Sequence, residues 1–176
     1  PAAIEIFEVP SMIQVGEWSH NKTPIPQQIR ILIEINKYLA EQCGDVNSVY
    51  YSIENNTIGE AALQSVAEIG EENITGIFLS EPKSHGNART YRRGFNTTHR
   101  SKLAICAKFK TLVETDKVKI NSKMLISEMK SFIASGNSYS AKVGDTDDLV
   151  MATLLVMRMA QTLKSYNPEL ESHIRD

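Results

Sequence analysis

Hydrophobic and polar residues alternate along the first twenty positions of the chain. Apolar and acidic side chains take turns over residues 3–9, and a second strand-like run follows at 12–18, after Pro10 and Ser11. A period of two residues is typical of a strand with one buried face. The sequence therefore predicts two strands that pair as an antiparallel hairpin.

A helical pattern follows the hairpin. Apolar residues recur at every third or fourth position over residues 26–43, with Pro24 and Pro26 at the start, where a helix tolerates proline. Gly44 comes directly after the last apolar position, so we expect it to end the helix.

Strand-like and helix-like patterns then alternate to the end of the chain. The strand-like runs are 46–53, 74–79, 118–120 and 139–143, and the helical patterns are 57–69, 99–115, 122–134 and 145–166. Thr57 and Glu60 have the spacing of a capping box at the start of the second helix. Residues 80–98 show no period and predict a long loop or exposed ribbon, and residues 167–176 form a polar tail. This order predicts a mixed α/β sheet flanked by helices.

Length and composition suit one ordinary globular domain covering residues 1–176. Apolar residues make up 41% of the chain, and 19 basic against 21 acidic residues give a net charge of −2. A disordered or collagen-like chain is thereby excluded, and a nucleic-acid partner would need a local basic patch. Cys43 and Cys106 match no metal-binding spacing and indicate a reducing compartment. No apolar run is long enough to span a bilayer, and no leader indicates secretion.

Such a basic patch occurs between Glu81 and Glu114, where the sequence has no acidic residue. Its cations are Lys83, Arg89, Arg92, Arg93, Arg100, Lys102, Lys108 and Lys110, and the first six are the candidate DNA-binding residues. Tyr91 and Phe95 lie among them. A local positive field of this kind suits a phosphate backbone. The alternative is a solvated loop and helix face.

Two acidic positions are candidate metal ligands. Glu54 lies where a predicted strand ends, and the carboxyl ends of strands gather functional groups in α/β sheets; the alternative is a plain exit of the strand into water. Asp145, Asp147 and Asp148 crowd the start of the last helix. Helix capping explains Asp145, but three acids repel one another, and a cation would relieve that repulsion. Asp147 and Asp148 are about 100° apart around a helix, so they would face two neighbouring ions.

Other catalytic signatures are absent. The sequence has neither a phosphate loop nor a G-x-G-x-x-G motif, its four histidines lack zinc spacing, and no nucleophile–histidine–acid set can be assembled from it.

Four stretches in a fixed order carry a resemblance to a known family. They are 49–62 (VYYSIENNTIGEAA), 78–82 (FLSEP), 94–98 (GFNTT, with Lys102 following) and 144–152 (GDTDDLVMA). Together they resemble the C-terminal nuclease domain of the large terminase subunit of tailed bacteriophages, in the variety found in T-even-like phages. The resemblance covers about residues 3–165.

The resemblance implies a ribonuclease H-like fold, in which the first strand would precede Pro1. It implies a metal-dependent endonuclease that cuts concatemeric double-stranded viral DNA. Glu54 and Asp148, with Asp147 beside it, would be the catalytic acids that hold two Mg²⁺ or Mn²⁺ ions. The third acid of the family would lie on the preceding strand, and neither Glu5 nor Glu8 matches its position.

The family also implies partners and a location. An ATPase domain would belong to the same longer polypeptide, and the small terminase subunit and the portal would be further partners. The protein would work in the cytoplasm of an infected bacterium. Two alternatives stay open: a catalytically incomplete DNA-binding module of the same fold, and another ribonuclease H-like nuclease of the resolvase or transposase type.

Overall fold

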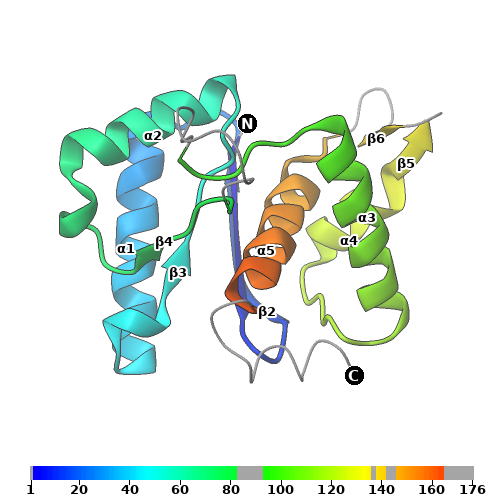
Figure 1. Cartoon of the computed structure of the whole chain (residues 1–176), viewed down its shortest axis with the longest axis horizontal. Coiled ribbons are helices and arrows are strands. Elements are labelled where there is room, and N and C mark those ends of the chain that lie inside the picture. The colour runs from blue at the N-terminus through cyan, green and yellow to red at the C-terminus, as the bar shows by residue number, and fades with distance from the viewer. Residues whose placement is uncertain (1, 83–92, 136–137, 142–145, 165–176) are drawn as a thin grey trace. The chain divides into compact units, whose positions relative to one another are not determined.

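The computed structural model describes residues 2–82, 93–135, 138–141 and 146–164 (Figure 1). The chain divides into two compact units. The first unit consists of Pro1–Asn21 and Thr98–Asp176, and the second unit of Lys22–Thr97. None of the described helices combines the length and apolar character that a bilayer crossing needs.

The first unit begins with the predicted hairpin, which is confirmed. Strand β1 (Ala2–Glu8) pairs antiparallel with β2 (Ile13–His20), with Ala2 opposite His20 and a register shift after Ile6. On the other edge of β2, the backbone at Met12 and Gln14 is hydrogen bonded to Lys119.

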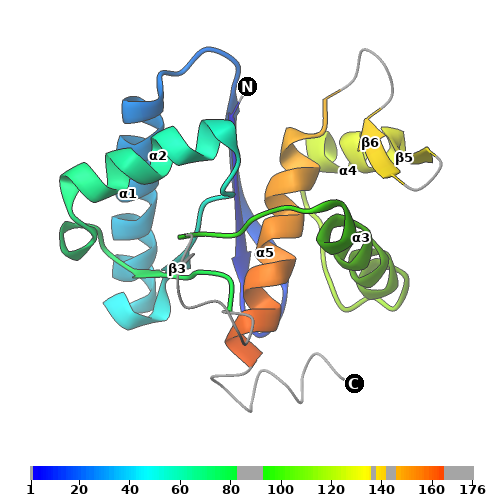
Figure 2. The ribbon, with the colours of Figure 1, turned by 45° about the horizontal axis from the view of Figure 1, so that its top comes forward.

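Three helices complete the first unit: α3 (His99–Glu114), α4 (Lys123–Ser131) and α5 (Asp148–Lys164). A short antiparallel pair, β5 (Phe132–Ser135) and β6 (Ser138–Ala141), follows α4. Helix α5 lies between the hairpin and helices α3 and α4 (Figures 1 and 2). Its apolar residues therefore meet neighbours on more than one side, which explains why its sequence is apolar almost all round.

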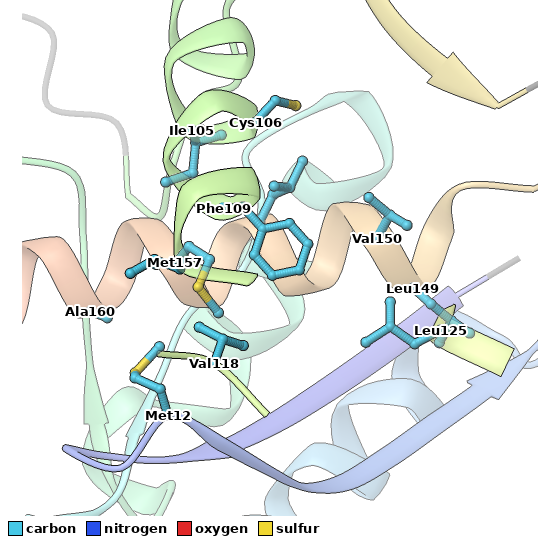
Figure 3. Packing of buried hydrophobic residues seen from close by; sticks show 12 residues of the cluster. Met12, Ile105, Cys106, Phe109, Val118, Leu125, Leu149, Val150, Met157 and Ala160 are labelled. Atoms are coloured by element: carbon cyan, nitrogen blue, oxygen red, sulfur yellow. The ribbon is translucent and has the colours of Figure 1, made fainter. Parts of the chain in front are cut away.

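The core of this unit gathers around α5 (Figure 3). Phe109 from α3, Leu125 from α4 and Met12 from the hairpin turn join Leu149 and Met157 of α5, and each of them is buried. The start of α5 is thereby anchored by apolar packing one residue after Asp148.

The second unit packs two helices against a short parallel strand pair. Helix α1 (Ile25–Cys43) ends at Gly44, whose φ of +70° is the left-handed cap that the sequence predicts. Helix α2 spans Thr57–Ile69, and β3 (Tyr50–Tyr51) pairs parallel with β4 (Ile77–Phe78). Two 3₁₀ turns, η1 (Val46–Ser48) and η2 (Glu71–Asn73), complete the unit.

Several predicted elements are shorter than the sequence suggests. The Asp45 side chain accepts hydrogen bonds from Asn47 and Ser48, which winds residues 46–48 into a 3₁₀ turn instead of the first half of a strand. Of the predicted strand 74–79, only Ile77 and Phe78 form β4. The predicted strand 118–120 is reduced to one bridge between Lys119 and Ile13.

The predicted helix boundaries also need correction. Helix α4 ends at Ser131 because Phe132–Ser135 pair with β6 as a strand, whereas the sequence predicted a helix to residue 134. Helix α2 is capped by Asn56, whose side chain accepts a hydrogen bond from the Gly59 amide; the predicted cap, Thr57, is already the first helical residue. The start of the last predicted helix at Asp145 and the tail 167–176 lie outside the described residues.

The structure is therefore a mixed α/β arrangement, as predicted at the coarse level. Its named strands form three two-stranded sheets within the described part of the chain. A single ribonuclease H-like sheet within one nuclease domain stays a prediction.

Candidate metal and nucleic-acid sites

Glu54 lies just beyond the carboxyl end of β3. The backbone there is paired parallel to Phe95: Ile53 accepts a hydrogen bond from the Phe95 amide at 3.1 Å, and the Asn55 amide donates to the Phe95 carbonyl at 2.7 Å. The Glu54 side chain is half-buried, and Phe95 is fully enclosed. The strand itself ends at Tyr51, earlier than predicted, and Glu54 forms an isolated parallel bridge with Phe95, 41 positions further on.

Two glycines enclose the backbone at this turn. A Cβ atom on Gly59, in the first turn of α2, would overlap the Glu54 carbonyl oxygen, and one on Gly94 would overlap the Ile53 carbonyl oxygen. Gly94 also has a φ of +77°, a conformation that other residues rarely adopt. Both glycines belong to the stretches that carry the family resemblance. The structure explains why glycine occupies these two positions: a side chain at either of them would collide with the backbone around Glu54.

Asn55 and Asn56 complete the turn. Asn55 is buried and donates from Nδ2 to the Arg93 carbonyl at 3.2 Å, while its Oδ1 has no hydrogen-bond partner among the described residues. Asn56 accepts from the Gly59 amide at 2.7 Å. These bonds fix the residues after Glu54 to both α2 and the chain at 93.

The second acidic position stands at the start of α5. Asp147 and Asp148 are both half-buried, and Leu149 and Val150 directly after them are buried in the core. A carboxylate from another helix meets this terminus: Glu128 of α4 accepts from the Leu149 amide at 3.0 Å and from the Val150 amide at 3.3 Å. Its other oxygen accepts from the Thr146 hydroxyl at 3.3 Å.

The environment of Glu128 shifts its acidity. Burial raises the pKa of the Glu128 carboxyl, and the charge of Asp148 raises it further. The hydrogen bonds from Val150, Leu149 and Thr146 act in the opposite direction, because they stabilise the carboxylate. No local sequence pattern points to Glu128, because its partners are 18 to 22 positions away in the chain.

A buried polar network joins the hairpin to the start of α4. Its centre is Gln14, which is 3% exposed. Gln14 donates from Nε2 to Glu5 at 2.7 Å and to Glu17 at 3.2 Å, and its Oε1 accepts from the amides of Asn121 and Ser122. Ser122 donates to Glu17 at 2.8 Å and caps α4. The α4 N-terminus is therefore fixed to β2.

Glu5 is the most perturbed acid of this network. Burial, followed by its hydrogen bond with Glu17, raises the pKa of Glu5 to about 9, against the action of the Gln14 amide. The charges of Glu17 and Glu128 add to the rise. The alternating pattern of this strand predicts a polar face for its acids, whereas Glu5 is only 8% exposed.

The predicted DNA-binding residues differ in their surroundings. Lys83, Arg89 and Arg92 lie outside the described residues. Arg93 forms an ion pair with Glu71, and its guanidinium carbon lies 5.2 Å from the centre of the Phe78 ring. Its cationic group is thus already engaged within the second unit.

Helix α3 carries the remaining predicted cations. Arg100 is exposed in the first turn, and the Lys102 ammonium lies 5.6 Å from the centre of the Phe132 ring. Lys110 is near Glu114 at 3.9 Å, both of them well exposed. The helix starts with a capping box between Thr98 and Ser101. A basic helix at the predicted place is confirmed, and its contact with DNA stays a prediction.

Within the described ranges, His, Cys, Asp and Glu side chains do not gather in groups of three that could hold a metal ion. Glu54 belongs to the second unit and Asp147 and Asp148 to the first. Their convergence on one pair of cations therefore stays a prediction. No family model matches the chain.

Proposed function

We propose that this chain is the nuclease domain of a bacteriophage DNA-packaging terminase, a metal-dependent endonuclease that cuts concatemeric double-stranded DNA. The observation that carries the proposal is the Glu54 turn, where a half-buried carboxylate follows a parallel strand and its backbone is enclosed by Gly59 and Gly94. A ligand for a catalytic metal must be held within about 0.5 Å of its working position, and such a closely packed turn suits that demand.

The proposed ligands fit a hard divalent cation. Glu54, Asp147 and Asp148 offer carboxylate oxygens, the donors that Mg²⁺ and Mn²⁺ prefer, and each side chain is only half-buried. When bound, two such ions activate a water molecule and stabilise the leaving 3′ oxygen of a phosphodiester. A hydrolysis of this kind needs no protein nucleophile, in keeping with a sequence that offers no candidate for one.

The chain's own residues would hold the DNA through its phosphates. Arg100 and Lys102 open the basic helix α3, and the proposal extends to Lys83, Arg89 and Arg92 in the preceding segment. Contacts with phosphates carry no sequence information, so binding would depend strongly on salt and little on sequence. Low sequence preference suits an enzyme that cuts long concatemers.

The proposed setting follows from the same resemblance. The chain would form part of a longer polypeptide with an ATPase domain, and would work with the small terminase subunit and the portal in the cytoplasm of the infected bacterium. The ribonuclease H-like fold is part of this proposal and is supported at the coarse level by the mixed α/β architecture.

The test is DNA cleavage by matched variants in Mg²⁺ or Mn²⁺. Glu54→Gln and Asp148→Asn keep side-chain size and remove one charge each, so we expect cleavage of duplex DNA to be lost while DNA binding persists. Asp147→Asn, measured beside Asp148→Asn, shows which aspartate is the primary ligand. The matched control is Glu60→Gln, because Glu60 is exposed in the first turn of α2 and should not affect cleavage.

Three other outcomes would contradict the proposal or favour another function. Cleavage that persists in both Glu54→Gln and Asp148→Asn contradicts the metal assignment. Binding of DNA without binding of Mn²⁺ favours a DNA-binding module without catalysis. A preference for branched DNA over plain duplex favours a resolvase-type nuclease.

A further inference from the structure

The start of α5 is held by a side chain that does not belong to α5. The first amides of a helix lack partners within the helix, and a nearby side chain usually caps them. Here the carboxylate of Glu128, from α4, accepts from the Leu149 and Val150 amides, and its second oxygen accepts from Thr146. The contacts of Glu128 therefore bracket Asp148, with one on its N-terminal side and two on its C-terminal side.

Glu128 is itself held in place from both directions. Its helix is capped by Ser122, which is tied to Gln14 and Glu17 of β2 through hydrogen bonds of 2.8 to 2.9 Å. Leu125, between the two, is fully buried in the core of the first unit. Helix α4, anchored to the hairpin at its start, thus holds the Glu128 carboxylate against the N-terminus of α5.

We propose that Glu128 is a positioning residue that sets the orientation of Asp148, and of Asp147 beside it, for metal binding. This inference rests on the proposed function, because it assumes that Asp148 is a metal ligand. Glu128 acts through the backbone on either side of Asp148 and has no need to touch the metal. Residues that orient a ligand in this way typically change metal affinity by roughly 10- to 100-fold when they are removed.

The test compares Mn²⁺ affinity in three variants of the full chain, with free Mn²⁺ measured by electron paramagnetic resonance. Glu128→Ala removes every acceptor and should weaken Mn²⁺ binding by roughly 10-fold or more. Glu128→Gln keeps an oxygen that can accept from the two amides, so it should lose clearly less Mn²⁺ affinity than Glu128→Ala. Ser127→Ala is the matched control: Ser127 is exposed on the same helix, next to Glu128, and its removal should leave Mn²⁺ affinity unchanged.

Hydrogen exchange supplies a readout that does not depend on metal. The amides of Leu149 and Val150 should exchange faster in Glu128→Ala than in the wild type, and should be unchanged in Ser127→Ala. An equal loss of Mn²⁺ affinity in Glu128→Gln and Glu128→Ala would make Glu128 a ligand and overturn the positioning role. Unchanged affinity in Glu128→Ala would overturn it as well. A wild-type chain that binds no Mn²⁺ would instead overturn the proposed function together with this inference.

Discussion

Glu5 and Glu17 are direct register partners across β1 and β2, and they meet at a shared donor, the side-chain amide of Gln14. Like charges directly opposite one another destabilise a strand pair. Burial and the Glu17 hydrogen bond raise the pKa of Glu5 to about 9, so Glu5 carries a proton at neutral pH and the repulsion is avoided. The hairpin therefore holds a buried acid beside Glu17, and Gln14 donates a hydrogen bond to each of the two side chains.

The free energy of unfolding should fall as the pH rises from about 4.5, the ordinary pKa of a glutamate, to about 9, the pKa of Glu5 in the folded chain. The unfolded chain releases the Glu5 proton near pH 4.5, whereas the folded chain keeps it up to about pH 9. The unfolded state thus binds fewer protons in this window, and the free energy of unfolding decreases, by the order of 3 kcal/mol between pH 4.5 and 7. Glu5→Gln mimics the protonated acid and should remove this slope in urea unfolding.

Glu8→Gln is the control for this experiment, because Glu8 lies on the same strand and is exposed. The control should keep the wild-type dependence on pH. A slope that survives in Glu5→Gln would show that another group causes it.

The Glu54 turn should not tolerate a side chain at Gly59. A Cβ there would overlap the Glu54 carbonyl oxygen, and backbone cannot move aside cheaply. Overpacking of this kind costs about 1–3 kcal/mol, so Gly59→Ala should lower the free energy of unfolding by that amount and weaken Mn²⁺ binding. In Gly16→Ala the new Cβ would meet only the flexible end of Ile6, at 2.9 Å, so unfolding should change less and Mn²⁺ binding should not change.

The start of α2 depends on Asn56. Its side chain accepts from the Gly59 amide at 2.7 Å, which satisfies one of the free amides of the first turn. Asn56→Ala should lower the free energy of unfolding by about 1 kcal/mol, and Asn56→Gly by only a few tenths, because glycine is a tolerated cap. Equal losses in the two variants, measured by denaturant unfolding, would contradict the capping role.

Arg93 and Arg100 should behave differently in DNA binding. Arg93 is engaged with Glu71 and Phe78, whereas Arg100 is exposed on the basic helix. Each phosphate contact contributes about 0.9 to the slope of log affinity against log salt. Arg100→Ala should reduce that slope by about this amount, and Arg93→Ala should leave it unchanged. The reverse ranking would place Arg93 in the DNA contact.

Local patterns in the sequence predict the regular elements well and their partners poorly. The hairpin and helices α2, α3 and α5 follow from the periodicity of apolar residues, and the end of α1 follows from Gly44. The predicted strand at 46–53 is longer than the observed one because the Asp45 side chain accepts a hydrogen bond from the Asn47 amide, which winds residues 46–48 into a 3₁₀ turn. Such a contact depends on geometry that a periodic pattern does not contain.

The candidate sites likewise divide into residues that a local sequence pattern reveals and residues that only distant contacts reveal. Glu54 and Asp148 could be selected because each lies at a predicted element boundary. Glu5 could not, because an alternating strand looks the same whether water or another element covers its acidic face. Glu128 could not, because its partners lie 18 to 22 positions away in the chain. Gln14 accepts hydrogen bonds from the amides of Asn121 and Ser122, which are more than a hundred positions further along the chain. No local sequence pattern predicts so distant a contact.

The proposed metal site requires Glu54 and Asp148 to act on the same cations. A double-mutant cycle on Mn²⁺ affinity, with Glu54→Gln, Asp148→Asn and the two combined, measures this directly. Residues that share a metal pair should be strongly non-additive, so we expect each single variant to lose nearly all the affinity that the double variant loses. Losses that simply add, or a single variant that binds Mn²⁺ as the wild type does, would contradict a shared metal site.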